Sequence, residues 1–295
     1  LRSPVPQSAG QSRPSPHPHC RGLGPLAPQR DSTQGPRVIR FDHVSKTYPG
    51  GTRAVDDFSL TIEQGSTTVF LGTSGCGKTT LMRMVNAMVT PTSGTVFVRG
   101  ADVTGADPVR LRRSIGYVLQ EGGLFPHRSI ADNIATVPRL EGVNKAESRE
   151  RALELLTLVG LEREMADRYP SQLSGGQRQR VGVARALANR ADILLMDEPF
   201  GALDPIVRAD LQRELKEIRR ALGTTILFVT HDVDEAFTLG DQVAVLSTGG
   251  RIEQVGTPAE LLSSPASPFV AEFVGASRAA RPVRIAGPGG LVVDD

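Results

Sequence analysis

The chain has 295 residues, 39% of them apolar, so its size and composition suit an ordinary globular protein of one large or two modest domains. Charges, glycines or prolines interrupt every apolar run before it reaches the roughly 18 to 20 residues of a membrane-spanning helix, so we expect any membrane role to be peripheral. The net charge is +2, but residues 1–36 hold four arginines and one aspartate, which leaves the rest of the chain close to neutral. A near-neutral body argues against a nucleic-acid groove, which needs clustered Lys and Arg. The only two cysteines, Cys20 and Cys76, predict no disulfide framework.

Both ends of the chain have the composition of poorly ordered segments. Residues 1–36 are rich in Pro, Ser and Gly, show no apolar periodicity, and are expected to form a disordered tail. They also lack the charged start, apolar middle and cleavage site of a secretory signal. Residues 276–295 are rich in Ala, Arg, Pro and Gly and are expected to form a loosely ordered tail. The folded domain is therefore expected over 37–275.

Strand and helix patterns alternate along this domain. In chain order, the sequence predicts strands over 38–41, 54–62 and 67–71, a helix over 79–89, and a strand over 95–99. Continuous apolar runs at 115–119, 193–196 and 225–229 suit strands buried on both faces of a parallel sheet. An amphipathic helix is expected over 144–159, capped by Gly160. Strands over 243–246 and 251–255 should form a hairpin around Gly249-Gly250, followed by a helix over 258–273. The pattern indicates an α/β fold with a mostly parallel sheet.

A glycine-rich loop lies between the third predicted strand and the first predicted helix. Its residues fit G-x-x-x-x-G-K-[ST], and the strand before it and the helix after it are the context that this phosphate-binding motif requires. The glycines let successive N–H groups point at phosphates, Lys78 can reach the outer phosphates, and the hydroxyl of Thr79 can bind magnesium. A turn that merely joins strand to helix is the plainer alternative. We expect phosphate contacts from Gly72, Thr73, Ser74, Gly75, Cys76, Gly77, Lys78, Thr79 and Thr80, with Cys76 a small filler.

Polar residues also follow three other predicted strands. Gln120 follows the strand that ends at 119, Asp197-Glu198 the strand that ends at 196, and Thr230-His231 the strand that ends at 229. Ligands of open parallel sheets bind outside the carboxyl ends of the strands, so these residues should line one edge with the phosphate loop.

Each of these residues has a catalytic or metal-binding interpretation and a plainer one. Asp197 can hold Mg²⁺ through water, and Glu198 can polarise a water for attack on a γ-phosphate. Gln120 can orient that water or complete the magnesium shell, and His231 can bond the γ-phosphate and hold Glu198. Taken singly, an Asp-Glu pair usually starts a solvated loop, and a lone Gln or His is usually structural. Their joint placement at strand ends favours the catalytic interpretation.

A second anion site is indicated further along the chain. Ser174 is expected to be the N-cap of a helix that starts near Gly175, and Gly175 and Gly176 would leave bare N–H groups at its start. The alternative is a helix cap with no further role.

The segment Leu173-Ser174-Gly175-Gly176-Gln177 resembles the signature of the ABC family. The other motifs accompany it in the family's order: Tyr48, the phosphate loop, Gln120, the signature, Asp197-Glu198, Gly201-Ala202-Leu203-Asp204 and His231. The resemblance covers about 38–275. It implies a P-loop NTPase (RecA-like) fold with an N-terminal antiparallel β subdomain and an inserted helical subdomain near 121–185.

The resemblance also implies roles for these residues. In the family, the signature of one subunit closes on ATP held by the other, so Ser174, Gly175, Gly176 and Gln177 would bind ATP across a head-to-tail dimer. Tyr48 would stack on adenine, Gln120 would sense the permease, and Asp204 would couple the two sites. The catalytic residues would be Glu198 as base, with His231, Gln120 and Lys78; Mg²⁺ would be held by Thr79, Gln120 and Asp197.

Within the family, several stretches are similar to importers of quaternary amines such as glycine betaine, carnitine or choline. These stretches include Met82 to Asn86, Leu111 to Gln120, Gly123 to His127 and Pro199 to Arg208. The implied protein is a peripheral ATPase at the cytoplasmic face of the membrane, working with permease subunits and an extracytoplasmic binding protein. Many such importers carry paired CBS domains after the ATPase; a short subgroup or a shortened C-terminus would each account for the length of this chain.

Two alternatives stay open. The cargo could be another small solute, such as an amino acid or a sulfonate, because cargo is chosen by the permease and the binding protein. A soluble ABC ATPase that acts on DNA or the ribosome is disfavoured, since such proteins usually carry a long coiled-coil insertion or two ATPase units, and each motif occurs here once.

Overall fold

The computed structural model describes residues 1, 37–120, 122–201, 203–278, 283–286 and 290–293, with side chains up to residue 275. Residues 2–36, where the disordered tail was expected, lie outside the described residues, as do Glu121 and Ala202. Residues 1–34 and 35–295 are separate units, and the fold described below is that of the second.

An antiparallel sheet forms the first part of this unit. Its described strands run in the order β2-β1-β4-β5, and the bounds are β1 (Arg37–Thr47), β2 (Arg53–Glu63), β4 (Ser93–Val98) and β5 (Ala101–Asp102). Strand β1 extends beyond the predicted 38–41 because it continues through bulges opposite both β2 and β4. Near the bulges, His43 (φ 50°) and Asp57 (φ 49°) have a left-handed backbone conformation. The alternation of apolar and polar residues in the sequence does not reveal this conformation.

A second, mostly parallel sheet has the described order β10-β9-β3-β8-β7-β6. The bounds are β3 (Thr67–Gly72), β6 (Gly116–Val118), β7 (Ile193–Asp197), β8 (Thr225–Thr230), β9 (Gln242–Ser247) and β10 (Arg251–Gly256). All pairs from β9 to β6 are parallel, and β10 returns antiparallel through the predicted hairpin. Strands β3 and β8 are buried at every residue, as the continuous apolar runs predicted. The α/β fold with an antiparallel N-terminal sheet is confirmed.

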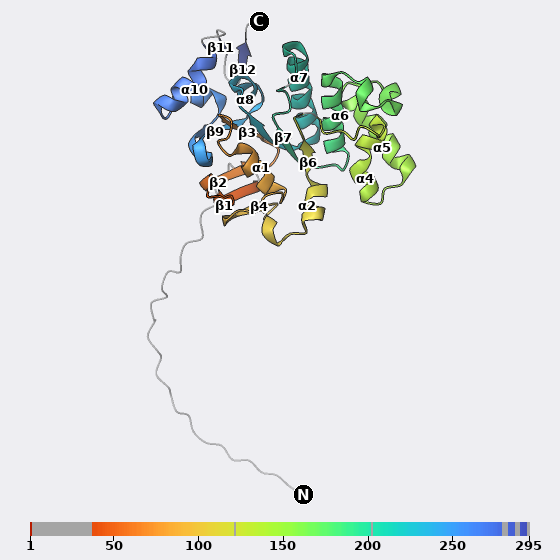
Figure 1. The fold of residues 1–295 in the computed structure, drawn as a ribbon, viewed down its shortest axis with the longest axis horizontal. Coiled ribbons are helices and arrows are strands. Elements are labelled where there is room, and N and C mark those ends of the chain that lie inside the picture. Colours follow the sequence, from red (N-terminus) through yellow and green to blue (C-terminus); the bar gives the residue numbers. More distant parts are fainter. Residues whose placement is uncertain (2–36, 121, 202, 279–282, 287–289, 294–295) are drawn as a thin grey trace. The chain divides into compact units, whose positions relative to one another are not determined.

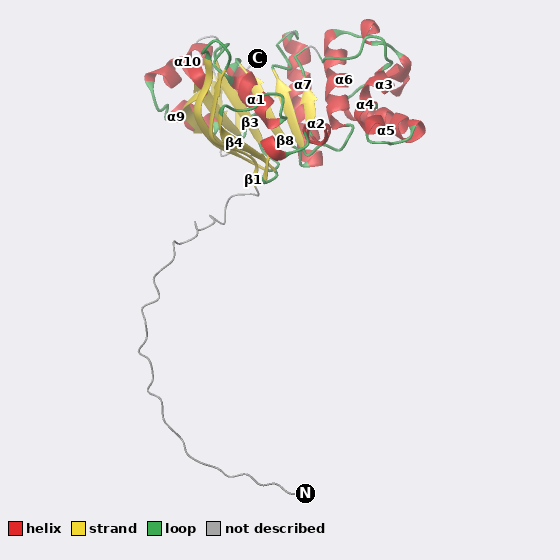
Figure 2. Cartoon of the chain, turned by 60° about the horizontal axis from the view of Figure 1, so that its bottom comes forward, coloured by secondary structure: helices red, strands yellow, loops and turns green. Residues whose placement is uncertain are grey.

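The parallel sheet divides the interior into two cores. Alternate residues of β3 face opposite sides, so Val69 and Leu71 pack into one core and Phe70 into the other. Phe70 meets Phe41 and Phe58 of the antiparallel sheet, with ring centroids 5.1 to 6.1 Å apart in this group. This aromatic cluster joins the two sheets, whose strands are yellow in Figure 2.

Helices cover the rest of the sheet (Figure 1). Helix α1 (Lys78–Val85) packs between the two sheets, while α7 (Pro205–Leu222) and α8 (Val233–Leu239) pack on the other face. A helical region, green in Figure 1, lies beyond β6 and β7 in the stretch where a helical subdomain was indicated. It contains α3 (Ile130–Ile134), α4 (Thr136–Leu140), α5 (Lys145–Leu158), α6 (Gly175–Leu187), and 3-10 turns at Arg163–Asp167 and Pro170–Gln172. Helix α5 begins after the Asn144 cap and ends before Gly160 (φ 66°), as predicted.

The remaining elements are short. They are 3-10 turns at Val103–Gly105 and Thr248–Gly250, α2 (Pro108–Ser114), α9 (Pro258–Ser263), α10 (Pro268–Arg278), β11 (Val283–Ala286) and β12 (Gly290–Val293). Among the described residues, no helix combines the length and apolar character needed to cross a membrane.

Two predicted helices have other bounds in the structure. The helix expected over 79–89 ends at Val85, because Ala87 turns left-handed (φ 55°) and the N–H groups of Met88 and Val89 return to the carbonyl of Arg83. The helix expected over 258–273 is two helices, broken at Ser264 before a proline. In the stretch 276–295, expected to be loosely ordered, the described residues include the end of α10 and the antiparallel pair β11-β12, and 279–282, 287–289 and 294–295 lie outside the described residues.

Gly94, near the start of β4, lies where β4 packs closely against the backbone of β1. A Cβ there would lie 2.0 Å from the backbone oxygen of His43, and φ is +76°. We expect Gly94→Ala to lower the free energy of unfolding by about 3 kcal/mol, the sum of a left-handed alanine and a displaced strand. Urea unfolding measures it.

Gly142→Ala is the matched control, because Gly142 has φ +88° but no atom within 4 Å of the added Cβ. It should lose only about 1 kcal/mol from the backbone conformation. Equal losses in the two variants would show that the contact with His43 does not restrict this position.

Candidate functional site

The glycine-rich loop joins β3 to α1 in a conformation that only glycine permits at two positions. A Cβ on Gly72 would lie 2.3 Å from the carbonyl oxygen of Leu246, and one on Gly77, which has φ +110° and caps α1, would lie 2.4 Å from that of Ala54. Thr73, Ser74 and Gly75 are exposed at the mouth of the loop. Backbone atoms of neighbouring segments therefore pack against one side of the loop, and residues 73–75 on the other side are exposed.

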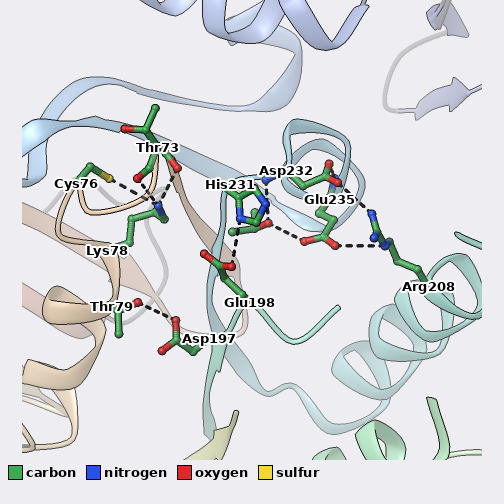
Figure 3. Close-up of polar contacts among 12 residues, drawn as sticks. Thr73, Cys76, Lys78, Thr79, Asp197, Glu198, Arg208, His231, Asp232 and Glu235 are labelled. Carbon is green, nitrogen blue, oxygen red and sulfur yellow. Dashed lines mark hydrogen bonds and ion pairs between the residues drawn. The ribbon is translucent and has the colours of Figure 1, made fainter. Parts of the chain in front are cut away.

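Lys78 lies inside this loop (Figure 3). It is 4% exposed, and its Nζ donates to the carbonyl oxygens of Gly72 at 2.7 Å and Thr73 at 2.8 Å and lies 3.7 Å from Sγ of Cys76. A buried ammonium is costly unless its donors are satisfied, and these loop atoms satisfy them. The positive charge is thereby placed among the N–H groups of the loop, where phosphate oxygens can bind it.

Thr79 and Asp197 bring two oxygen ligands together across the site. Thr79 Oγ1 donates to Oδ1 of Asp197, the last residue of β7, at 2.9 Å. The hydroxyl of Tyr117 lies 3.4 Å from the other carboxylate oxygen, and burial, with a smaller contribution from the Asp197 charge, raises the pKa of Tyr117. A hydroxyl and a carboxylate suit Mg²⁺, which takes few protein ligands and completes its shell with water and phosphate oxygens. The donor set present therefore fits this ion, although no cluster of three or more acidic, His or Cys ligands occurs in the described part of the chain.

Glu198 and His231 lie next to each other at the ends of β7 and β8. His231 Nδ1 is 3.2 Å from Oε2 of Glu198, and the backbone N–H of Glu198 donates to the carbonyl of Val229 at 3.0 Å. Glu198 has a left-handed backbone (φ 45°), an uncommon conformation for a residue with a side chain. Both side chains remain partly exposed, 24% for Glu198 and 54% for His231. The carboxylate can accept a proton from a bound water while the imidazole restricts its orientation.

Gln120 and Tyr48 flank this cluster. The amide nitrogen of Gln120 would lie 3.5 Å from a Cβ on Gly201, which places it beside the loop that follows Glu198. The Tyr48 hydroxyl is 3.5 Å from Oγ1 of Thr80 on α1, and 37% of the Tyr48 surface is exposed. Lys46 Nζ lies 5.3 Å from the centroid of the Tyr48 ring, and this partly exposed ring beside the phosphate loop can stack on a nucleotide base.

Ser174 forms the predicted N-cap of α6. Its Oγ accepts from the N–H of Gln177 at 3.2 Å, and Oε1 of Gln177 accepts from the N–H of Ser174 at 2.9 Å, which completes a capping box. The prediction of the cap is confirmed. The N–H groups of Gly175 and Gly176 start the helix, and Gly176 packs closely on Val207 of α7. Asp204 caps α7 by accepting from the N–H of Val207 at 3.0 Å.

The structure joins most, but not all, of the predicted residues. The phosphate loop, Asp197, Glu198 and His231 share one edge of the sheet (Figure 3), whereas the contacts described for the Ser174 hydroxyl stay within its own helix turn. Sequence analysis missed Tyr117, Arg208, Asp232 and Glu235. Tyr117 was hidden in an apolar run, and only the tertiary contacts reveal that Arg208 and Asp232 gather around the buried Glu235.

Comparisons with known proteins agree with this geometry. The ABC transporter family matches residues 55–201. The carnitine transport ATP-binding protein OpuCA of Listeria monocytogenes is 52% identical over 241 residues, which cover 82% of this chain and 60% of that protein. The glycine betaine uptake system ATP-binding protein YehX of Escherichia coli is 49% identical, over 81% of this chain and 77% of that protein. The spermidine/putrescine import ATP-binding protein PotA of Thermobifida fusca is also 49% identical, over 84% and 64%.

A solved structure shares the fold as well. The ATP-binding cassette MJ0796, in a dimeric post-hydrolysis state with ADP and Pi, superposes with a TM-score of 0.67 at 33% identity, over 75% of this chain and 98% of that one. The chain spans only 60% of the length of its OpuCA relative from Listeria. Because the relatives match the whole span of the phosphate loop, the signature and the strand-end carboxylates, the chain belongs to the ABC transporter family of ATP-binding proteins.

Proposed function

We propose that this protein is the ATP-hydrolysing subunit of an ABC importer that takes up a quaternary-amine osmoprotectant such as glycine betaine, carnitine or choline. The presence of two contacts on one sheet edge supports the ATPase part of the proposal. Thr79 and Asp197 lie 2.9 Å apart beside the phosphate loop, and Glu198 and His231 lie 3.2 Å apart on the same sheet edge. A phosphate cradle, a metal-binding pair and a base with its orienting group are the parts that phosphoryl transfer to water requires.

The chain's own residues divide the work. Loop N–H groups and Lys78 bind the β- and γ-phosphates, while Tyr48 stacks on the base. Thr79, Asp197 and Gln120 would hold Mg²⁺, which when bound would neutralise charge on the phosphates. Glu198 accepts the proton of the attacking water, and His231 keeps the Glu198 carboxylate in place and bonds the γ-phosphate.

A second chain completes the site in this proposal. The start of α6, at Ser174, Gly175, Gly176 and Gln177, is exposed at Ser174 and Gly175 and has no acidic residue in its first turn, and the relative MJ0796 is dimeric. In a head-to-tail dimer this helix end binds the γ-phosphate of ATP held by the partner subunit. Asp204, exposed at the start of α7, then lies at the seam and couples the two sites.

The cargo and the membrane partners follow from the relatives and from the quaternary-amine sequence motifs. The subunit would dock on the cytoplasmic face of permease subunits, which receive cargo from an extracytoplasmic binding protein. Relatives named for carnitine and glycine betaine support the quaternary-amine class. The polyamine relative, at 49% identity, makes another small solute the second candidate.

Uptake of labelled solute tests the cargo. Co-expressed with the permease and binding protein of its own operon in cells that lack osmoprotectant uptake, the chain should support accumulation of glycine betaine, carnitine or choline at high osmolarity. Spermidine, an amino acid and a sulfonate serve as comparison solutes. Accumulation of one of these in place of the quaternary amines would replace the proposed cargo and leave the ATPase proposal intact.

Glu198→Gln should abolish turnover without abolishing ATP binding. The amide keeps the shape of the side chain but cannot accept the proton, so we expect ATP hydrolysis to fall about 100-fold or more. The variant should remain dimeric with ATP, which size-exclusion chromatography with light scattering measures. Glu217→Gln, on the exposed face of α7, is the control. Hydrolysis near the wild-type rate in Glu198→Gln would assign the base elsewhere.

Lys78→Ala should lower the affinity for ATP. Loss of a charge-assisted phosphate contact should weaken ATP binding by about 10-fold or more, measured by titration with a fluorescent ATP analogue. Lys216→Ala, remote from the loop on α7, should bind ATP like the wild type. An unchanged affinity in Lys78→Ala would mean that the ammonium stays bonded to the loop carbonyls when nucleotide binds.

A further inference from the structure

A buried carboxylate lies behind the site with no role in the chemistry above. Glu235 of α8 is 3% exposed, and its Oε2 accepts from Oγ1 of Thr230 at 2.7 Å. Burial raises the pKa of Glu235, and the Thr230 bond with the charges of Arg208 and His231 opposes that effect, while Asp232 adds to it. A carboxylate in such a place stays charged only if its partners are retained.

Besides Thr230, Arg208 is the partner of this carboxylate, at ion-pair rather than hydrogen-bond distance. Figure 3 shows its contacts with Glu235 and Asp232, and it also contacts Leu203. Its Nε lies 3.7 Å from Oε1 of Glu235, and Nη1 donates to Oδ2 of Asp232 at 3.1 Å. Its Nη2 donates to the carbonyl of Leu203 at 3.3 Å. The planar guanidinium of Arg208, in the first turn of α7, thus links three segments. These are the loop before α7, Asp232 directly after His231, and Glu235 of α8.

The backbone on both sides of His231 depends on the same cluster. Asp232 Oδ1 accepts from the N–H groups of Asp234 at 2.8 Å and Glu235 at 3.1 Å and so caps α8. The N–H of Asp232 donates to Oγ1 of Thr230 at 3.0 Å. Because Thr230 and Asp232 are both tied to the Arg208 and Glu235 pair, the position of the imidazole between them is set by that pair.

The cluster also borders the catalytic carboxylate. A small cavity is lined by Glu198, Gly201, Arg208, Thr230, His231, Asp232 and Glu235. On one side of it lies the pair of His231 and Glu198, and on the other lies the Arg208 contact to Leu203, the neighbour of Asp204. A shift of the loop at Leu203 is therefore transmitted to His231 through one side chain.

We propose that Arg208 is a positioning residue, which together with Glu235 and Asp232 ties the Leu203–Asp204 loop to His231 and so holds His231 against Glu198. The inference rests on the proposed ATPase function and deepens it, because the loop at Asp204 is the part expected to face the partner subunit. The contacts described for Arg208 are to Leu203, Asp232 and Glu235, so it acts through the backbone that flanks His231.

Four variants separate positioning from general stability. Arg208→Met removes the donors and leaves Glu235 buried without its cation, so it should lower the melting temperature. The double variant Arg208→Met with Glu235→Gln removes both charges and should recover much of the melting temperature, since a buried pair replaced on both sides by neutral groups of similar shape can be nearly neutral. Arg208→Lys keeps the charge. Arg213→Gln is the control, because Arg213 pairs only with Asp210 on the exposed side of the same helix.

Steady-state ATPase kinetics give the first readout. In the full chain we expect the double variant to lose about 10-fold or more in kcat with KM for ATP changed by no more than about twofold, although its melting temperature is near that of the wild type. Arg208→Lys should regain part of kcat, and Arg213→Gln should match the wild type. A double variant that regains kcat together with its melting temperature, or a lysine variant no better than methionine, would overturn the proposal.

The second readout needs no nucleotide. The imidazole ¹H and ¹⁵N signals of His231, assigned by their loss in His231→Ala, should move in Arg208→Met and in the double variant and stay in place in Arg213→Gln. Unmoved His231 signals overturn the positioning role whatever the kinetics. Moved signals in a protein whose wild type does not hydrolyse ATP would retain the positioning role and reject the proposed function.

Discussion

The register of three parallel strands is the constraint on which the site depends. Asp197 of β7 pairs with Val229 of β8, and Val229 pairs with Phe70 of β3, so the three strands end within two residues of one another. That alignment places the carboxylate of Asp197 against Thr79 and the carboxylate of Glu198 against His231. A slip of one residue in β7 would exchange its two faces and withdraw Asp197 from the edge.

The two cores on either side of the parallel sheet stabilise a sheet edge that contains energetically unfavourable groups. Lys78 and Glu235 are ionisable and almost fully buried, and Glu198 has a left-handed backbone. The burial of the first two is offset by local contacts: loop carbonyls for Lys78, and Thr230 with Arg208 for Glu235. The continuous apolar strands supply the burial that lets such features persist at this edge of the sheet.

The prediction of the fold succeeded where the signal was local. Apolar runs located β3, β6, β7 and β8, and cap residues located the end of α5 and the start of α6, because burial on both faces and helix capping leave a residue-type pattern. The prediction of where α1 ends was wrong, because Ala87 is left-handed and two later N–H groups bond to the carbonyl of Arg83. No residue type in this stretch predicts such a turn.

For the site, the sequence by itself determined which groups are present: a glycine-rich loop with its lysine, a hydroxyl and carboxylates that we propose for magnesium and base, a histidine, and a second helix start rich in glycine. These follow from side-chain type and from position at strand or helix ends. The tertiary structure alone decided which groups meet, among them Tyr117 on Asp197 and Arg208 on Leu203, Asp232 and Glu235. The physical reason is that burial and ion pairing join residues far apart in sequence, and their cost and gain exist only once the chain has packed.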